Sequence, residues 1–195
     1  MGGAETILNV NVVLADDGDR SAALDIRREV YCSIGKLDPF CLSDRFDERA
    51  AHFLGGVHGE WVSSARMVSD DGDFEMERYF DLSRYRDLGR CAEINRFAIL
   101  PEFRGSAVAY AMFRGFYRYA IANGIRFFCI VATPGQNSRM YRHIGFSQVG
   151  KTVMYEELHE LHDAYVLDLQ AALPQWREKR PRILDYFLET VDGIG

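Results

Sequence analysis

The chain has 195 residues, 48% of them hydrophobic and 27% charged, which is typical of a globular protein with a sizeable core. Its formal net charge of −6 leaves no basic excess to neutralise phosphates, so nucleic acid is not expected as its main partner. No run approaches the ~20 apolar residues of a membrane span, and no secretory signal pattern is present. We therefore expect a single cytoplasmic domain over residues 1–195, without integral membrane association.

The first half of the chain predicts three strands and one helix. Residues 6–14 are rich in β-branched side chains and predict a strand, whereas residues 20–34 place apolar side chains on one helical stripe. Residues 50–57 and 60–68 predict antiparallel strands joined by a tight turn at His58–Gly59. The sequence Asp-Asp-Gly-Asp at 70–73 indicates another turn.

The second half predicts alternating strands and helices. We expect a strand at 91–100, a helix at 106–123 that ends before Gly124, a buried strand at 127–132, a short helix at 136–143, and closing strands at 146–155 and 164–170. The apolar strand at 127–132 should be covered on both faces and run parallel to its neighbour. Residues 171–195 predict a helical extension, with Pro174 and Pro181 as helix breakers.

The segment Arg104-Gly-Ser-Ala-Val-Ala109 follows a strand and opens a helix. Small residues let a ligand approach the backbone, and the free amides and dipole of a helix start favour an anion such as a phosphate. The alternative is an ordinary strand–helix connection. A second motif follows downstream, where Asn137 and Tyr141 lie four residues apart on the short helix that ends at Gly145-Phe146.

Together these segments resemble the acyl-CoA-binding core of the GNAT N-acyltransferase superfamily, whose loop reads Arg/Gln-x-x-Gly-x-Gly/Ala. Ala107 replaces the usual middle glycine. The resemblance implies an α/β (α+β) GNAT fold, in which helices flank a mixed, mostly antiparallel sheet with splayed parallel central strands. It also implies a site for the acyl group and phosphopantetheine formed by Ala98, Ile99, Leu100, Arg104, Gly105, Ser106, Ala107, Val108, Ala109 and Asn137. Tyr141 would protonate the departing thiolate, or is simply a packed aromatic.

A narrower resemblance covers roughly residues 20–155. The ordered series Arg27, Val30, Tyr31, Asp44, Asp47, Arg66, Phe80, Glu93, Arg96 and Phe97 resembles the acyl-homoserine lactone synthases and the long-chain N-acyl amino acid synthases of the N-acyl-tyrosine type. The lactone synthases usually carry an Arg and a Trp after the first helix. Here residues 32–40 read Cys-Ser-Ile-Gly-Lys-Leu-Asp-Pro-Phe, which favours another acceptor.

The resemblance implies that Glu93, Arg96, Phe97 and Tyr141 are catalytic. Glu93 is the expected general base, because amide formation needs a neutral amine and a partly buried carboxylate can accept its proton. Alternatively Glu93 forms a structural ion pair with Arg96 or Arg66. Residues 93 and 96 would point to opposite faces of a regular strand, so we predict a β-bulge near 94–98 with free amides that act as an oxyanion hole.

The expected substrate-binding residues are Arg27, Tyr31, Asp44, Asp47 and Arg66. Asp44 and Asp47 could hold a substrate ammonium or a basic side chain such as Arg27 or Arg66, or they could simply form a solvated N-cap and turn. The two arginines could bind a substrate carboxylate. Alternatively they could brace the loop that carries Asp44 and Asp47, called the acidic loop below, and we favour this role for Arg27.

The function implied is transfer of a long-chain fatty acyl group from acyl carrier protein to the α-amino group of an amino acid, with tyrosine as a candidate acceptor. The alternatives are an acyl-homoserine lactone synthase that uses S-adenosylmethionine, and a non-catalytic module that binds an acylated carrier. Acyl-phosphopantetheine of acyl carrier protein, or acyl-CoA, would be a co-substrate rather than a bound cofactor.

Six basic residues offer a docking face for the acidic carrier protein, or are simply solvated: Arg104, Arg114, Arg118, Arg139, Arg142 and Lys151. Arg104, Arg114 and Arg118 are expected within one arc of the long helix, at about 100° per residue. The four cysteines, Cys32, Cys41, Cys91 and Cys129, have no CxxC spacing, so we expect no metal site and no redox motif.

Overall fold

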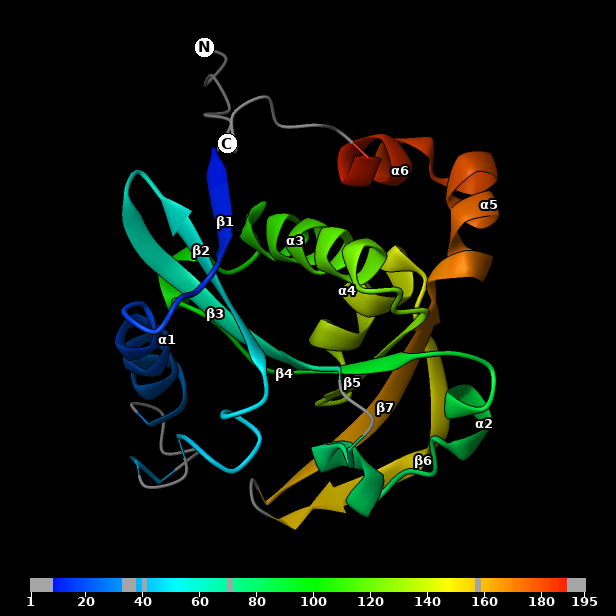
Figure 1. Cartoon of the computed structure of the whole chain (residues 1–195), viewed down its shortest axis with the longest axis horizontal. Helices are drawn as coiled ribbons and strands as arrows, with labels where there is room; N and C mark the ends of the chain where they lie inside the picture. The colour runs from blue at the N-terminus through cyan, green and yellow to red at the C-terminus, as the bar shows by residue number, and fades with distance from the viewer. Residues whose placement is uncertain (1–8, 33–37, 40–41, 70–71, 157–158, 189–195) are drawn as a thin grey trace. The chain divides into compact units, whose positions relative to one another are not determined.

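The computed structural model describes residues 9–32, 38–39, 42–69, 72–156 and 159–188 (Figure 1). The predicted strand residues 6–8, the turn at Asp70–Asp71, most of the divergent segment 32–40, Cys41 and residues 189–195 lie outside these ranges. The chain divides into two compact units, which are described separately. The first contains residues 1–67 and 95–116, and the second contains residues 68–94 and 117–195.

Three antiparallel strands form the frame of the first unit: β1 (Val10–Leu14), β2 (Ala51–Val57) and β3 (Glu60–Val68, whose last residue belongs to the second unit). The turn between β2 and β3 has His58 at φ +54° and Gly59 at φ +87°. Two successive left-handed residues fit the twist of a two-residue hairpin. The predicted hairpin is therefore confirmed.

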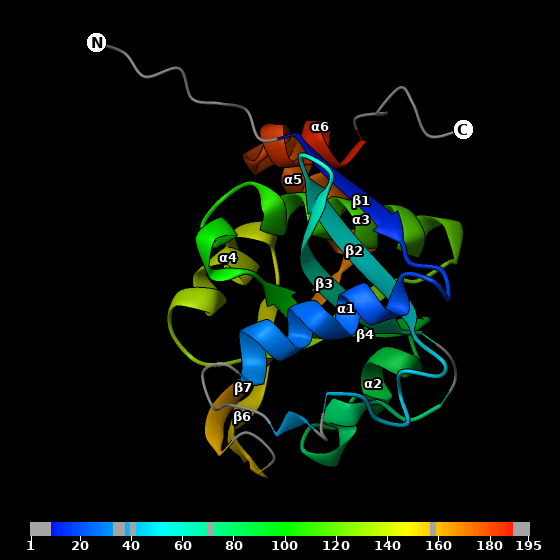
Figure 2. The same cartoon turned by 90° about the vertical axis from the view of Figure 1, so that its left-hand side faces the viewer.

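Helices cover both faces of these strands. Figure 2 shows α1 (Arg20–Arg27) in front of β2 and β3. Side chains alternate between the faces of a strand, and Leu54 of β2 packs with Ala23 and Ile26 of α1. Phe53 points the opposite way and meets Phe116 of α3 (Val108–Ala122), with the ring centroids 5.0 Å apart. The predicted helix at 20–34 continues after α1 as a π-helical segment, η1 (Arg28–Cys32). Cys32 is the last residue of the described range 9–32.

A glycine allows α3 to approach β1 closely. A Cβ atom on Gly115 would lie 2.7 Å from Cγ1 of Val12, well inside van der Waals contact. Packing at interior density leaves no space for that atom. Gly115 therefore sets the distance between α3 and the sheet of the first unit.

The second unit contains the first half of β4 (Cys91–Ile99), followed by β5 (Phe127–Ala132), β6 (Ser147–Tyr155) and β7 (Glu160–Asp168). β4 runs parallel to β5 over Cys91–Glu93, as predicted, whereas β7 is antiparallel to both β5 and β6. Among the described residues the strand order is β1-β2-β3-β4-β5-β7-β6. The sheet is thus mixed and mostly antiparallel, as expected.

The end of β7 corrects the predicted strand at 164–170. The strand ends at Asp168, whose carboxylate accepts hydrogen bonds from the backbone amides of Gln170 and Ala171 and so caps α5 (Leu169–Lys179). An N-cap carboxylate satisfies amides that a helix start leaves free, and it ends the strand here.

Of the two carboxyl-terminal prolines, Pro174 differs from expectation, whereas a helix break does occur at Pro181, as predicted. Pro174 lies inside α5 and does not break it, because the helix is held in place by the buried Ala172 and Trp176 on either side. Pro181 is the first residue of α6 (Pro181–Leu188), where a missing amide costs nothing. Two short helices between β3 and β4 were not predicted, η3 (Glu75–Arg78) and α2 (Ser83–Arg86). In the described ranges, no helix has the length and apolar character needed to cross a membrane.

Candidate active site

The segment after β4 in the first unit is a short, exposed connection. A 3-10 turn, η4 (Pro101–Phe103), leads into it, and α3 begins at Val108 rather than at the predicted Ser106. The Ser106 hydroxyl donates to the carbonyl of Phe103 (2.6 Å) and accepts from the amide of Val108 (3.3 Å). It therefore caps the helix start.

Gly105 leaves open space beside this helix start. It has φ +75°, and no atom lies within 4 Å of the position that a Cβ would take. Arg104 is exposed and bonds the carbonyl of Ile99, so it precedes α3 and is not part of it. Ala98 and Leu100 instead pack in the cluster beneath α1, so their side chains belong to the core.

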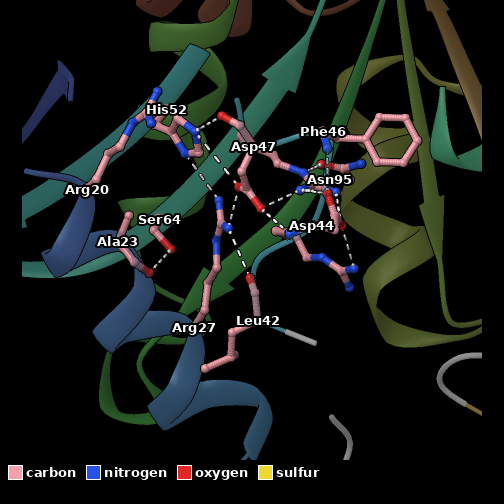
Figure 3. A network of polar contacts seen from close by, with 12 residues as sticks. Arg20, Ala23, Arg27, Leu42, Asp44, Phe46, Asp47, His52, Ser64 and Asn95 are labelled. Carbon is pink, nitrogen blue, oxygen red and sulfur yellow. Dashed lines mark hydrogen bonds and ion pairs between the residues drawn. The ribbon is translucent and has the colours of Figure 1, made fainter. Parts of the chain in front are cut away.

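An extensive polar network in the first unit includes Asp44, Asp47 and Asn95 (Figure 3), and each of them binds Arg66 of β3. Its guanidinium, which is fully buried, forms a two-pronged ion pair with Asp44 (2.6 and 2.8 Å) and a third bond with Asp47 (2.8 Å). Its Nε donates to the side-chain carbonyl of Asn95 (2.5 Å). Arg66 therefore joins the acidic loop to the second half of β4.

A second buried arginine holds the same loop from α1. Nη1 of Arg27 donates to Asp47 (2.7 Å) and to the carbonyl of Leu42 (3.3 Å), and its side chain is fully buried. Nη2 lies 3.3 Å from Nδ1 of His52, while Nε2 of His52 lies 2.9 Å from the carbonyl of Asp47. Because arginine can only donate and a carbonyl can only accept, His52 carries its proton on Nε2. The observed contacts are those of the bracing alternative.

Arg96 lies in the middle of β4 with φ +50°. A left-handed, non-glycine residue is unusual within a strand and is typical of a bulge. The turn in the backbone directs the guanidinium to Asp44, where Nη2 donates to the carboxylate (3.1 Å). This is a backbone irregularity within residues 94–98, and the predicted bulge with its free amides stays a prediction.

The charges of this network perturb one another. Burial alone would raise the pKa values of Asp44 and Asp47, but the neighbouring arginines outweigh it and lower both. Burial lowers the pKa of Arg27, and Asp47 offsets this only in part. Burial also lowers the pKa of His52, in agreement with the neutral tautomer that its contacts require.

The second unit holds Glu93, whose carboxylate is fully buried. Its oxygens accept hydrogen bonds from the backbone amides of Glu75 (2.7 Å) and Met76 (3.1 Å), at the start of η3. These backbone donors were not predicted. They hold the carboxylate in a fixed orientation at the point where the parallel pairing of β4 with β5 ends.

Tyr141 is also in the second unit, on α4 (Gln136–Ile144). It is buried, and its ring lies 5.7 Å from that of Phe146 and 5.9 Å from that of Tyr165. These contacts fit the packed-aromatic alternative, and its role toward a thiolate stays a prediction. Asn137 lies on α4, but its side chain is outside the described part of the structure.

The first unit thus brings together Arg27, Asp44, Asp47, Arg66 and Arg96. The hydroxyl of Tyr31 also donates to the carbonyl of Phe97 (2.8 Å), which joins two further predicted residues. Sequence reasoning missed His52 and Asn95. Both are polar side chains buried within mainly apolar strands, which is the signal that could have revealed them.

Cys91 and Cys129 are buried in β4 and β5, where a free thiol packs as a small hydrophobe. Among the described residues, no group of three His, Cys, Asp or Glu side chains is arranged to hold a metal ion.

Comparison with known proteins gives a family. The model of the FeeM family, N-acyl amino acid synthase FeeM, matches residues 22–168. No curated protein aligns significantly with the chain.

Three solved structures illustrate the fold. FeeM, an N-acyl amino acid synthase from uncultured soil microbes, has 20% identity and a TM-score of 0.75, over 88% of this chain and 96% of that one. The acyl-homoserine lactone synthase LasI has 17% identity and a TM-score of 0.62, over 85% and 95%. A polyamine N-acetyltransferase from Drosophila melanogaster, which forms N-acetylagmatine, has 15% identity and a TM-score of 0.65, over 83% and 100%. The predicted GNAT-type fold is confirmed.

Proposed function

Because the chain belongs to the FeeM family of N-acyl amino acid synthases, we propose that it moves a long-chain fatty acyl group from acyl carrier protein to the α-amino group of an amino acid, with tyrosine as the first acceptor to test. The observation that carries the proposal is the family match over residues 22–168, which includes Glu93 and the whole arginine–aspartate network. In the first unit, that network holds the acidic loop with two fully buried arginines.

In the proposed reaction Glu93 is the general base. The amine nitrogen attacks the thioester carbonyl, the C–N bond forms and the C–S bond breaks, while the carboxylate removes the amine proton. The two backbone hydrogen bonds from η3 support this role, because they leave the carboxylate little rotational freedom. A base held in one orientation lowers the reorganisation that proton transfer requires.

The other roles follow from chemistry that the residues can supply. Backbone amides near Arg96 would stabilise the negative charge that develops on the thioester oxygen, and the phenol of Tyr141 would protonate the departing thiolate. The exposed helix start after Gly105 would receive the phosphate of phosphopantetheine. No covalent enzyme intermediate is needed.

Arg27 is assigned to bracing rather than to substrate. Its guanidinium is fully buried and binds Asp47, the carbonyl of Leu42 and the ring of His52. A carboxylate substrate would have to displace these partners. Asp44 is the member of the network assigned to face the acceptor, since 27% of its side chain is exposed, against 9% for Arg96.

The test compares cells that overproduce the wild type, Glu93→Gln or Glu60→Gln, by mass spectrometry of their lipid extracts. Glu60 is an exposed residue at the start of β3 and serves as the matched control. We expect N-acyl amino acids from the wild type and from Glu60→Gln, and a loss of about 10²-fold or more for Glu93→Gln. Undiminished product from Glu93→Gln would exclude the base assignment.

Incubation of the purified protein with acyl carrier protein thioesters and amino acids tests the donor. Release of the carrier thiol together with N-acyl amino acid supports the proposal. Methylthioadenosine released from S-adenosylmethionine would indicate a lactone synthase instead. Carrier binding without thiol release for any amino acid would indicate a binding module.

A further inference from the structure

The carboxyl end of α4 is capped partly by its own chain. The carbonyl of Tyr141 accepts hydrogen bonds from the backbone amides of Gly145 (3.0 Å) and Phe146 (2.9 Å). Gly145 adopts φ +121°, a conformation that side-chain-bearing residues rarely take, and it turns the chain into β6. The last turn of any helix leaves further carbonyls that need partners.

α5 provides partners for two of these carbonyls. Nε1 of Trp176 donates to the carbonyl of Ile144 (2.6 Å), and Nη1 of Arg180 donates to the carbonyl of Arg142 (3.1 Å). A guanidinium at this position also suits the partial negative charge at the carboxyl end of a helix. Trp176 in α5 and Arg180 at the C-cap of α5 thus both hold the carboxyl end of α4.

The indole of Trp176 has little freedom to move. Its side chain is fully buried, with ring centroids 5.2 Å from Phe187 of α6 and 6.0 Å from Tyr117 of α3. Figure 1 shows α5 in orange beside α6 in red, and both belong to the second unit. A Cβ on Gly145 would lie 3.4 Å from Nε1, so the indole lies directly against the turn that ends α4.

We propose that Trp176 is a positioning residue for acyl transfer, which sets the position of α4, and with it Tyr141, through the hydrogen bond to the carbonyl of Ile144. The inference rests on the proposed function, because it gives α4 a role in the reaction. The bond reaches α4 three residues after Tyr141, less than one helical turn away. α5 begins at Leu169, beyond the residues 22–168 that the family model matches. The carboxyl-terminal helices would therefore contribute to catalysis without touching substrate.

Trp176→Phe tests the inference, since phenylalanine keeps an aromatic ring but cannot donate the hydrogen bond. The matched control is Phe187→Leu, which loosens the same aromatic cluster and leaves that bond intact. We expect Trp176→Phe to lower kcat for acyl transfer about tenfold, with the KM for the amino acid changed less than twofold. We expect Phe187→Leu to keep kcat within twofold of the wild type, even if its melting temperature falls as far as that of Trp176→Phe.

A double-mutant cycle shows whether Trp176 acts through Tyr141. If it does, adding Trp176→Phe to Tyr141→Phe lowers kcat by less than twofold further, because coupled residues are not additive. Full multiplication of the two effects would overturn the inference, as would equal losses of kcat in Trp176→Phe and Phe187→Leu.

Hydrogen exchange gives a readout that does not depend on activity. The amides of Gly145 and Phe146 should exchange at least tenfold faster in Trp176→Phe than in the wild type and in Phe187→Leu, because the turn they close has lost its support. Unchanged exchange would overturn the inference even in an active enzyme. If the wild type transfers no acyl group at all while exchange responds as expected, the proposed function fails and the structural role of Trp176 stands alone.

Discussion

Asp47→Asn is the substitution that most directly tests the buried network of the first unit. The carboxylate of Asp47 accepts bonds of 2.7 Å from Arg27 and 2.8 Å from Arg66, and both guanidinium groups are fully buried. Asparagine keeps the shape but removes the charge, and its NH₂ group cannot accept from an arginine. Removing one partner of a buried ion pair costs about 3–5 kcal/mol, because the remaining charge stays desolvated.

Urea unfolding at pH 7 measures this loss, with Asp25→Asn as the control. Asp25 pairs with Arg28 on the exposed face of α1, where both side chains are more than half exposed. A surface pair of this kind contributes no more than about 0.5 kcal/mol. A loss below about 1 kcal/mol for Asp47→Asn, similar to that of the control, would refute the conclusion that the network is desolvated.

The same network predicts how acid affects stability. The pKa of Asp47 is lowered in the folded protein, so the unfolded chain binds its proton first as the pH falls. The stabilisation is therefore complete above the unfolded pKa of about 3.9 and is lost as the pH falls through the lower folded value. Asp47→Asn should lose less additional stability than the wild type between pH 5 and pH 3. An equal loss in both proteins would contradict the sign of the shift.

Three further predictions concern His52, the packing of Gly115, and two basic residues of α3. In urea unfolding, His52→Gln should lose less stability than the wild type when the pH falls from 7.5 to 5.5. Burial lowers the pKa of His52, so below about pH 6.5 the unfolded chain takes up the proton while the folded protein does not. An identical loss of stability in both proteins would contradict a neutral His52. Gly115→Ala should destabilise the protein by about 1–3 kcal/mol through overpacking against Val12. In thermal unfolding, combining it with Val12→Ala should relieve most of that loss. Additive losses of the two substitutions would rule out the contact. Replacing both Arg114 and Arg118 of α3 with Glu should raise the KM for acyl carrier protein about tenfold at low salt, with kcat kept; steady-state kinetics with an unchanged KM would exclude this docking face.

Sequence reasoning works where a pattern is local. Alternation and β-branched residues give β2 and β3, and the two-residue turn at His58–Gly59 fixes their pairing. The apolar run at 127–132 correctly predicts a buried strand, β5, that pairs in parallel with β4. The strand predicted at 164–170 runs too far: Asp168 interrupts the apolar run that ends at Leu167, and an Asp before a helix is an N-cap signal.

The candidate site is predictable as a set of residues but not as a set of contacts. The family resemblance selects Asp44, Asp47 and Arg66, and the structure joins them. The backbone amides that hold Glu93 lie 17 and 18 residues away, in a short 3-10 helix with no periodic signal. The position of Arg96 depends on a left-handed backbone, which residue type alone does not indicate.

The way the chain is shared between the two units limits how the protein can be dissected. The boundaries fall after Met67, Ile94 and Phe116, so the chain passes from one unit to the other three times, twice in the middle of a regular element. No single cut yields either unit as a continuous polypeptide, and a fragment ending at Met67, Ile94 or Phe116 would end inside β3, β4 or α3, respectively. Assignment of roles to the two units therefore depends on point substitutions in the whole 195-residue chain, since deletion variants would report mainly on misfolding.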